Sequence, residues 1–174
     1  MPGIRRPTVL LAALAVAACG PAAPDFEVNG AAVWVETSAP FARQAIFPQR
    51  IESTLEIALR YWGGDWSDLR GRSITFGGDA VTCGGHDRAL GCFDGDIRVA
   101  TADPGLGTFH CVEQTVLVHE VGHAVIGDRL HEDPRWMEFG AVREALAGRT
   151  GWGEDGEVEC ELFPSVWRHP PGSR

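Results

Sequence analysis

The sequence predicts a single α+β domain, and three observations support this fold class. The chain has 174 residues, the length of one ordinary domain. Hydrophobic residues make up 44% and charged residues 22% of it, which is a globular composition rather than a disordered or collagen-like one. Short β-branched segments alternate with longer segments of helical periodicity, so we expect strands and helices in one fold.

The first half of the chain contains two predicted strands with a helix between them. Residues 31–37 (AAVWVET) alternate and are β-branched, which is typical of a strand. Residues 48–62 carry apolar side chains at helical spacing, and Gly63 and Gly64 follow, so we predict an amphipathic helix that ends there. Residues 72–76 (RSITF) predict a second strand.

The second half is expected to contain one more strand and two more helices. Residues 77–95 are rich in Gly and Asp, and we interpret them as a loop or an irregular hairpin. Residues 96–101 (DIRVAT) predict a strand, and residues 111–126 predict a helix with a dense apolar face. Residues 136–148 predict a further helix, and the tail from residue 150 looks irregular.

The charge balance argues against a nucleic-acid partner. All 15 basic residues are Arg, and they stand against 24 Asp and Glu, which gives a formal net charge of −9. A nucleic-acid-binding surface needs a net basic patch or stripe, and the sequence contains none. We expect no nucleic acid as a partner, and we expect a monomer.

The N-terminal segment combines a charged start with a short apolar run. Arg5 and Arg6 precede an apolar run over residues 8–18, which is shorter than the roughly 20 residues that a spanning helix needs. The run ends in V-A-A-C at residues 16–19. This ending resembles the bacterial lipobox, in which the cysteine, here Cys19, is lipidated and becomes the mature N-terminus.

The lipobox resemblance implies a division of the chain and a location. It implies a lipoprotein signal peptide over residues 1–18, a lipidated N-terminus and tether over residues 19–30, and a folded domain over residues 31–174. The protein would be exported and held at a membrane of the bacterial cell envelope by its lipid. The alternative is a plain signal peptide whose cysteine lies near the cleavage site by chance.

The remaining cysteines predict disulfides. With Cys19 lipidated, four cysteines remain, and an even number in an exported chain favours two bridges. Three pairings are possible, of which we favour Cys83–Cys92 as a local staple and Cys111–Cys160 as a link between the tail and a helix. A zinc knuckle is the alternative, although its cysteines would be more closely spaced than Cys83 and Cys92.

The predicted helix over residues 111–126 contains a candidate metal site. His119 and His123 lie four residues apart and therefore within about 40° of each other around the helix, so both imidazoles can reach one ion. Glu120 lies on the same side and can accept a proton from water without being a ligand. This pattern is H-E-x-x-H, the zincin signature, and Gly122 inside it leaves room for close packing. The alternative is a pair of histidines on a solvated helix face.

The residues after the motif resemble two zincin groups, and each suggests a third ligand. The stretch from His119 to Met137 resembles the matrixin-like metzincins, which read HExxHxxGxxH and have a methionine turn beneath the metal. This resemblance implies that Gly127 ends the helix, that His131 is the third ligand and that Met137 forms the turn. The glycine falls four rather than three residues after His123, and the third histidine falls eight rather than six after it.

The second resemblance is to the small gluzincins, which follow HExxH with a segment such as P-x-W-L-x-E-G. Residues 134–140 (PRWMEFG) are similar, but Phe139 occupies the position of the ligand glutamate and Glu138 precedes it. Asp128 is a further candidate ligand. We favour His131, because imidazole suits zinc and this residue requires no rotation of a helix.

Either resemblance implies a zincin-like fold, with a small mixed sheet packed on a helix and on the HExxH helix. The strand over residues 96–101 would lie along the cleft as an edge and pair with an extended peptide. The implied function is a membrane-anchored zinc metallopeptidase acting on a peptide or protein, in which His119, His123 and His131 hold Zn²⁺ and Glu120 is the general base. The alternatives are a non-catalytic lipoprotein with a closed structural zinc site, and a binding module in which the motif is incidental.

Overall fold

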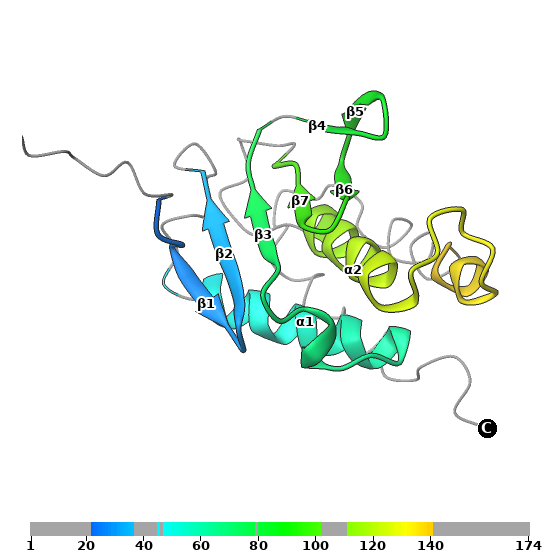
Figure 1. Ribbon diagram of the computed structural model, residues 1–174, viewed down its shortest axis with the longest axis horizontal. Helices are drawn as coiled ribbons and strands as arrows, with labels where there is room; N and C mark the ends of the chain where they lie inside the picture. The colour runs from blue at the N-terminus through cyan, green and yellow to red at the C-terminus, as the bar shows by residue number, and fades with distance from the viewer. Residues whose placement is uncertain (1–21, 37–44, 46, 79, 102–110, 141–174) are drawn as a thin grey trace, which may run out of the picture.

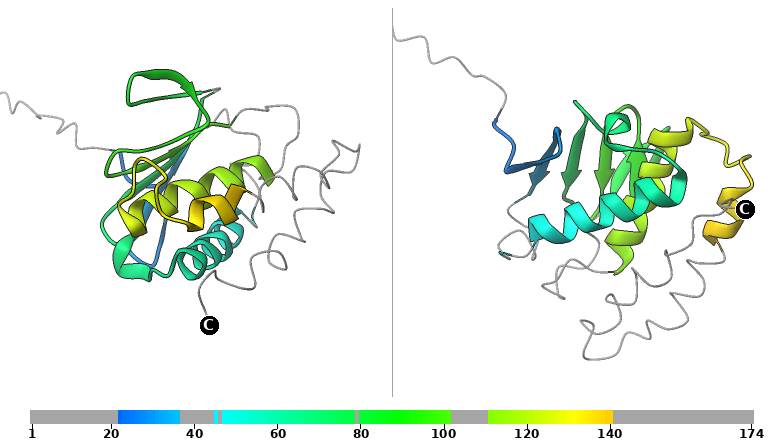
Figure 2. Two further views of the ribbon diagram at one scale, coloured as in Figure 1. Left: turned by 90° about the vertical axis from the view of Figure 1, so that its right-hand side faces the viewer. Right: turned by 90° about the horizontal axis from the view of Figure 1, so that it is seen from below.

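The computed structural model has one mixed five-stranded sheet with two long helices on the same side of it (Figures 1 and 2). The structure describes residues 22–36, 45, 47–78, 80–101 and 111–140. In chain order the elements are β1 (Phe26–Val28), β2 (Ala31–Val35), α1 (Phe47–Trp62), the 3-10 helix η2 (Trp66–Asp68), β3 (Ser73–Phe76), β4 (Val81–Cys83), β5 (His86–Ala89), β6 (Gly91–Phe93), β7 (Ile97–Val99) and α2 (Cys111–Ile126).

The sheet has parallel strands at its centre and an antiparallel strand at each edge. Its strand order is β1-β2-β3-β7-β6, and β4 and β5 form a separate two-stranded hairpin. The pairs β2–β3 and β3–β7 are parallel. Parallel neighbours need a long crossover, and α1 supplies the one between β2 and β3. The predicted α+β class and mixed sheet are confirmed.

The edge of the sheet beside α2 is β6, not the strand predicted over residues 96–101. That strand is β7, and it lies inside the sheet between β3 and β6. The pairing of β6 with β7 is antiparallel, with Cys92 opposite Arg98. The expectation of an edge at residues 96–101 is therefore wrong. Because β6 has three residues and begins with Gly91, it carries no alternating pattern that could have marked it inside residues 77–95.

The sheet also begins earlier in the chain than the predicted start at residue 31. β1 lies inside residues 19–30, the segment expected to be a tether, and pairs antiparallel with β2. The two strands are joined by Asn29 and Gly30, both with positive φ, as a type I′ turn requires. An Asn-Gly pair between two strands is a strong hairpin signal, and it extends the folded domain to Phe26.

Apolar side chains from both layers form one core between the sheet and the helices. Alternate residues of the strands face the helices, namely Val33, Ile74, Phe76, Ile97 and Val99. The helix α1 contributes a buried stripe at helical spacing, comprising Phe47, Ile51, Leu55, Ala58, Leu59 and Trp62. This helix begins one position earlier than predicted, and it ends at Gly63 with a left-handed φ and a bond from Gly64 N–H to the Leu59 carbonyl of 2.8 Å.

Gly122 lets α2 approach the aromatic side chains that pack against it. A Cβ at this position would lie 2.6 Å from the Trp62 ring and 2.8 Å from the Trp136 ring. The Trp62 indole also donates a hydrogen bond of 2.7 Å to the Val118 carbonyl, which holds α1 against α2. The predicted role of Gly122 in close packing is therefore confirmed.

Replacing Gly122 with alanine should destabilise the protein by about 1–3 kcal/mol relative to a Gly140→Ala control. The control also gains the helical preference of alanine, but a Cβ at Gly140 meets no atom within 4 Å. The difference between the two variants therefore isolates overpacking against the tryptophans. Urea denaturation of both variants measures it, and equal unfolding midpoints would contradict the packing described.

The remaining sequence predictions fall partly outside the described part of the chain. Residues 135–140 are helical, and the rest of the helix predicted over residues 136–148 lies outside the described residues, as do the signal peptide and Cys19. Among the residues described, no helix combines the length and apolar character needed to cross a membrane.

Candidate metal centre

The helix α2 positions the first two histidines of the site. Its observed bounds match the predicted residues 111–126, and His119 and His123 are one turn apart on it. It ends at Gly127, whose φ of 66° and N–H bond of 3.0 Å to the His123 carbonyl form the expected cap. The chain therefore turns back immediately after the second histidine.

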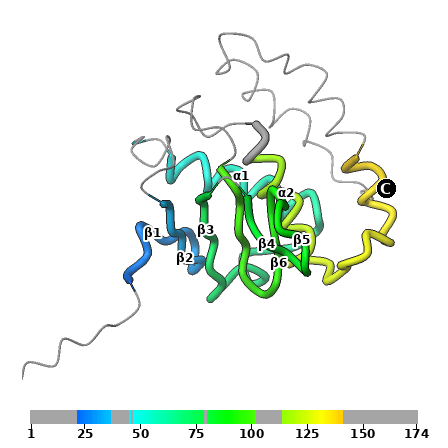
Figure 3. The backbone as a smooth tube through the Cα atoms, turned by 90° about the horizontal axis from the view of Figure 1, so that it is seen from above, coloured from blue at the N-terminus to red at the C-terminus, as the bar shows by residue number. Residues whose placement is uncertain are grey.

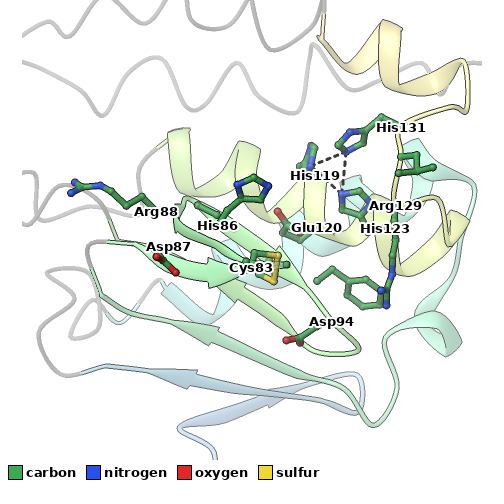
Figure 4. A pocket seen from close by; sticks show the side chains of 17 residues that line it. Cys83, His86, Asp87, Arg88, Asp94, His119, Glu120, His123, Arg129 and His131 are labelled. Atoms are coloured by element: carbon green, nitrogen blue, oxygen red, sulfur yellow. Dashed lines mark hydrogen bonds between the residues drawn. A yellow bond between two sulfur atoms is a disulfide. The ribbon is translucent and has the colours of Figure 1, made fainter.

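The loop after α2 brings His131 to the same point (Figure 4). His131 adopts a left-handed backbone conformation with a φ of 60°, which is uncommon for a residue other than glycine. Its Nε2 atom lies 3.3 Å from Nε2 of His119 and 3.1 Å from Nε2 of His123, and the latter two nitrogens are 3.2 Å apart. Three ring nitrogens thus form a nearly equilateral triangle.

This triangle fits a metal ion. A tetrahedral ion with metal–nitrogen bonds of about 2.0–2.1 Å requires its ligand nitrogens roughly 3.3 Å apart. The three observed separations agree with that requirement. His119, His123 and His131 can therefore hold a metal ion together.

The protonation state of His123 suits a metal ligand. Its Nδ1 lies 2.6 Å from the Asp128 carbonyl oxygen, which can only accept a hydrogen bond, so the ring proton is on Nδ1 and the lone pair is on Nε2. Burial is the main cause that lowers the pKa of His123, and the positive charge of Arg129 contributes in the same direction. The lowered pKa favours the neutral ring that metal binding requires.

Asp128 stabilises the loop instead of joining the triangle. One carboxylate oxygen accepts a hydrogen bond of 2.9 Å from Leu130 N–H. The other accepts bonds from Asp133 N–H at 2.8 Å and from the Trp136 indole N–H at 3.1 Å. These bonds, that of Asp133 first, hold the pKa of Asp128 below its usual value. The Asp128 carboxylate therefore stabilises the conformation of the loop that contains His131.

Arg135 connects the same loop to α1 through hydrogen bonds. Arg135 hydrogen-bonds the Asp133 carboxylate with two of its nitrogens, at 2.9 and 2.7 Å, and these bonds lower the pKa of Asp133 to about 2. Another nitrogen of Arg135 donates to the Trp62 carbonyl. Since Trp62 also bonds to α2, the loop and the two helices form one connected unit.

Glu138 and Met137 point away from the three histidines. Both are exposed, and Met137 exposes 82% of its surface. In the helical turn over residues 135–140, Trp136 and Phe139 are three residues apart and buried on the inner face. Met137 and Glu138 lie between them in the sequence and are exposed on the outer face. The predicted methionine turn is therefore wrong. Glu138, the candidate ligand that the gluzincin resemblance suggested, does not join the three-histidine group.

Trp136 occupies the place that the metzincin resemblance gave to Met137. It is 7% exposed, and its ring centroid lies 4.8 Å from that of His119, 4.7 Å from that of His123 and 4.4 Å from that of His131. One indole therefore contacts all three imidazoles. The sequence signal for it was the apolar pair at positions 136 and 139, which predicts the inward face of a helical turn.

Glu120 is buried beside the histidines and carries the most perturbed carboxyl group of the site. It is 5% exposed, and burial raises its pKa to about 7. The backbone of the edge strand β6 packs directly on the Glu120 side chain at Gly91. Only glycine fits there, because a Cβ at Gly91 would lie 2.4 Å from a Glu120 carboxylate oxygen. The packing of β6 therefore depends on a glycine that the sequence alone did not single out.

The histidines and Glu120 lie in a cleft of about 1070 Å³. One wall is formed by the β4–β5 hairpin and β6, and the other by α2 and the loop that follows it (Figure 4). Figure 3 shows the course of the backbone through these elements. The predicted disulfide Cys83–Cys92 is present and ties β4 to β6 within the first wall. The second predicted pair, Cys111–Cys160, lies outside the described side chains.

Comparisons of the chain with protein-family models, with curated proteins and with solved structures found no match. They assign no family to it.

Proposed function

We propose that the protein is a zinc-dependent metallopeptidase of the zincin type. The observation that carries this proposal is the convergence of three histidine Nε2 atoms beside a buried glutamate in an open cleft. Catalytic zinc sites have three protein ligands and an open position, whereas structural sites have four protein ligands. Within the described residues, no fourth histidine, cysteine or carboxylate joins the group. Zinc fits this donor set, because imidazole is a ligand that zinc favours.

In the proposed mechanism, the chain's own groups position the reactants and move the proton. A bound zinc ion would supply Lewis-acid chemistry by acidifying a water molecule and polarising the scissile carbonyl. Glu120 takes the proton from the attacking water and later delivers it to the leaving amine. Asp128 and Trp136 hold the imidazoles in place for both steps. The sheet edge that lines the cleft is β6, so an extended peptide would pair with this strand.

The N-terminal sequence supports a location for this activity. The apolar run and the V-A-A-C ending at residues 16–19 favour export and lipidation of Cys19. The peptidase would then act in the bacterial cell envelope, attached to a membrane by its lipid, on peptide or protein substrates. The Cys83–Cys92 disulfide suits an oxidising compartment of that kind.

Zinc content provides the test of the metal site. After dialysis against a weak chelator, the wild-type protein should retain about one zinc ion per chain, and His131→Ala should retain almost none, because two histidines cannot hold the ion tightly. His86→Ala is a matched control, since His86 lines the same cleft but does not belong to the three-histidine group. Equal zinc in His131→Ala and wild type would contradict the assigned ligand, and a wild-type protein without zinc would overturn the proposed function.

Binding of a hydroxamate inhibitor tests whether the zinc site is open. A hydroxamate needs a free coordination position, which a closed structural site with four protein ligands lacks. Binding by the zinc-loaded protein, together with chelator-sensitive hydrolysis of peptides, supports the peptidase. Retained zinc without hydroxamate binding favours the non-catalytic zinc protein instead.

A further inference from the structure

The loop between α2 and the helical residues 135–140 contributes a positively charged residue to the lining of the cleft, but none of its negatively charged residues. Arg129 lines the cleft together with Leu130 and His131 (Figure 4). The three carboxylates of the same loop do not line it, namely Asp128, Glu132 and Asp133. The loop is acidic in composition, but it contributes an arginine and none of its carboxylates to the lining of the cleft.

The guanidinium of Arg129 is not neutralised by the described part of the protein. Arg98 forms an ion pair with Asp94, and Arg135 forms one with Asp133. Within the described ranges, Arg129 has no hydrogen-bond or ion-pair partner. Three nearby carboxylates have other partners, because Asp94 and Asp133 are paired with these other arginines and Asp128 accepts three hydrogen bonds.

An unpaired arginine in this position has a consequence for ligands. The chain carries a net charge of −9, so its surface as a whole disfavours anions. An arginine presents a planar fork of donors that matches a carboxylate with two parallel hydrogen bonds. Two arginines line the cleft without an ion pair among the described residues, Arg88 on β5 and Arg129. The side chain of Arg88 points away from the three histidines (Figure 4), whereas Arg129 is close enough to His123 to lower its pKa. A carboxylate on a ligand bound near the histidines would therefore meet Arg129 rather than Arg88.

We propose that Arg129 binds a carboxylate of the substrate, so that the protein acts on peptides with a negative charge close to the scissile bond. This inference rests on the proposed function and adds the substrate class to it. The carboxylate comes either from an Asp or Glu side chain or from the C-terminus of the peptide, and the two sources share the chemistry that Arg129 recognises.

A binding experiment on the zinc-loaded protein tests this recognition without requiring turnover. The probes are a succinyl hydroxamate with a free carboxylate and the same hydroxamate with that carboxylate converted to a primary amide. The carboxylate form should bind wild type more tightly by about 10-fold at low salt, because charge-assisted hydrogen bonds are the strong ones. Arg129→Gln should remove this preference while retaining the affinity for the amide, and Arg129→Glu should reverse it.

Controls separate the specific effect from a general change in charge. Arg60→Gln removes the same charge from the exposed side of α1 and should keep the preference of wild type. Arg129→Lys should keep part of it, since a lysine retains the charge but not the fork of donors. An equal preference in Arg129→Gln and wild type, or no preference in wild type, overturns the inference. Failure of both probes to bind overturns the proposed function and this inference with it.

Peptide pairs identify the source of the carboxylate. One pair differs by Glu against Gln beside the scissile bond in an amidated peptide, and the other by a free against an amidated C-terminus. A lower KM for the Glu peptide assigns the side chain, and a lower KM for the free C-terminus assigns the terminal group. In either case Arg129→Gln should raise that KM to the value of the neutral peptide, and equal KM values in both pairs would contradict the proposal.

Discussion

Replacing Glu120 with glutamine should lower the rate of peptide hydrolysis by about 10²–10⁴-fold, the range that a positioned general base contributes, while zinc stays bound. Glutamine has nearly the same shape and keeps contact with Gly91, but it cannot accept a proton. Since the metal would be held by three imidazoles and not by this side chain, the zinc content should match that of wild type. The two results together separate proton transfer from metal binding.

The measurement compares initial rates and zinc content in the same preparations. Glu138→Gln is the matched control, because Glu138 undergoes the same chemical change but is exposed outside the site. The control should retain both zinc and activity. Unchanged hydrolysis by Glu120→Gln would refute its role as general base, and loss of zinc from this variant would show that the carboxylate contributes to metal binding.

The parts of the fold that the sequence predicts well are those determined by local spacing. The helix α2 has the predicted bounds, and α1 differs by one residue, because a long apolar stripe with a glycine at its end defines a helix almost by itself. The pairing of His119 and His123 follows directly from helix geometry. Ligand chemistry favours His131 over Glu138 and Asp128 as the third ligand, and the loop after α2 brings His131 to the same point.

The parts that the sequence does not predict depend on contacts between distant segments. Strand β6 is too short to carry a pattern, and its position at the edge depends on packing against α2 through Gly91. The cleft wall depends on the β4–β5 hairpin, which the Cys83–Cys92 disulfide ties to this edge. A family resemblance also misled at one point, because it assigned to Met137 a position that the helical turn gives to its neighbour Trp136.

Trp136 connects the stability of the protein to the candidate metal site. Its ring contacts the three imidazoles, and its indole N–H bonds to the Asp128 carboxylate that braces the loop around His131. The same ring packs on Trp62, with centroids 4.3 Å apart, and reaches the glycine at the centre of α2. Removing the tryptophan therefore affects the core and the ligands together.

We expect Trp136→Ala to destabilise the protein by about 3–5 kcal/mol, as is typical for truncating a buried tryptophan, and to weaken zinc binding by about 10–100-fold. Trp136→Phe keeps a ring beneath the histidines but loses the bond to Asp128, so it should give smaller effects on both quantities. Urea denaturation measures the free energy of unfolding, and competition with a chelator measures zinc affinity under conditions where every variant is folded.

Trp34→Ala separates a general loss of stability from an effect on the metal site. Trp34 is half-buried on β2, which contributes no residue to the cleft, so this variant should be less stable than wild type but bind zinc with the same affinity. If Trp136→Ala binds zinc as tightly as Trp34→Ala, the tryptophan beneath the histidines is only a core residue. If it binds more weakly at matched stability, the indole and its bond to Asp128 hold the three imidazoles in the geometry that a metal ion requires, which is the role that this packing predicts.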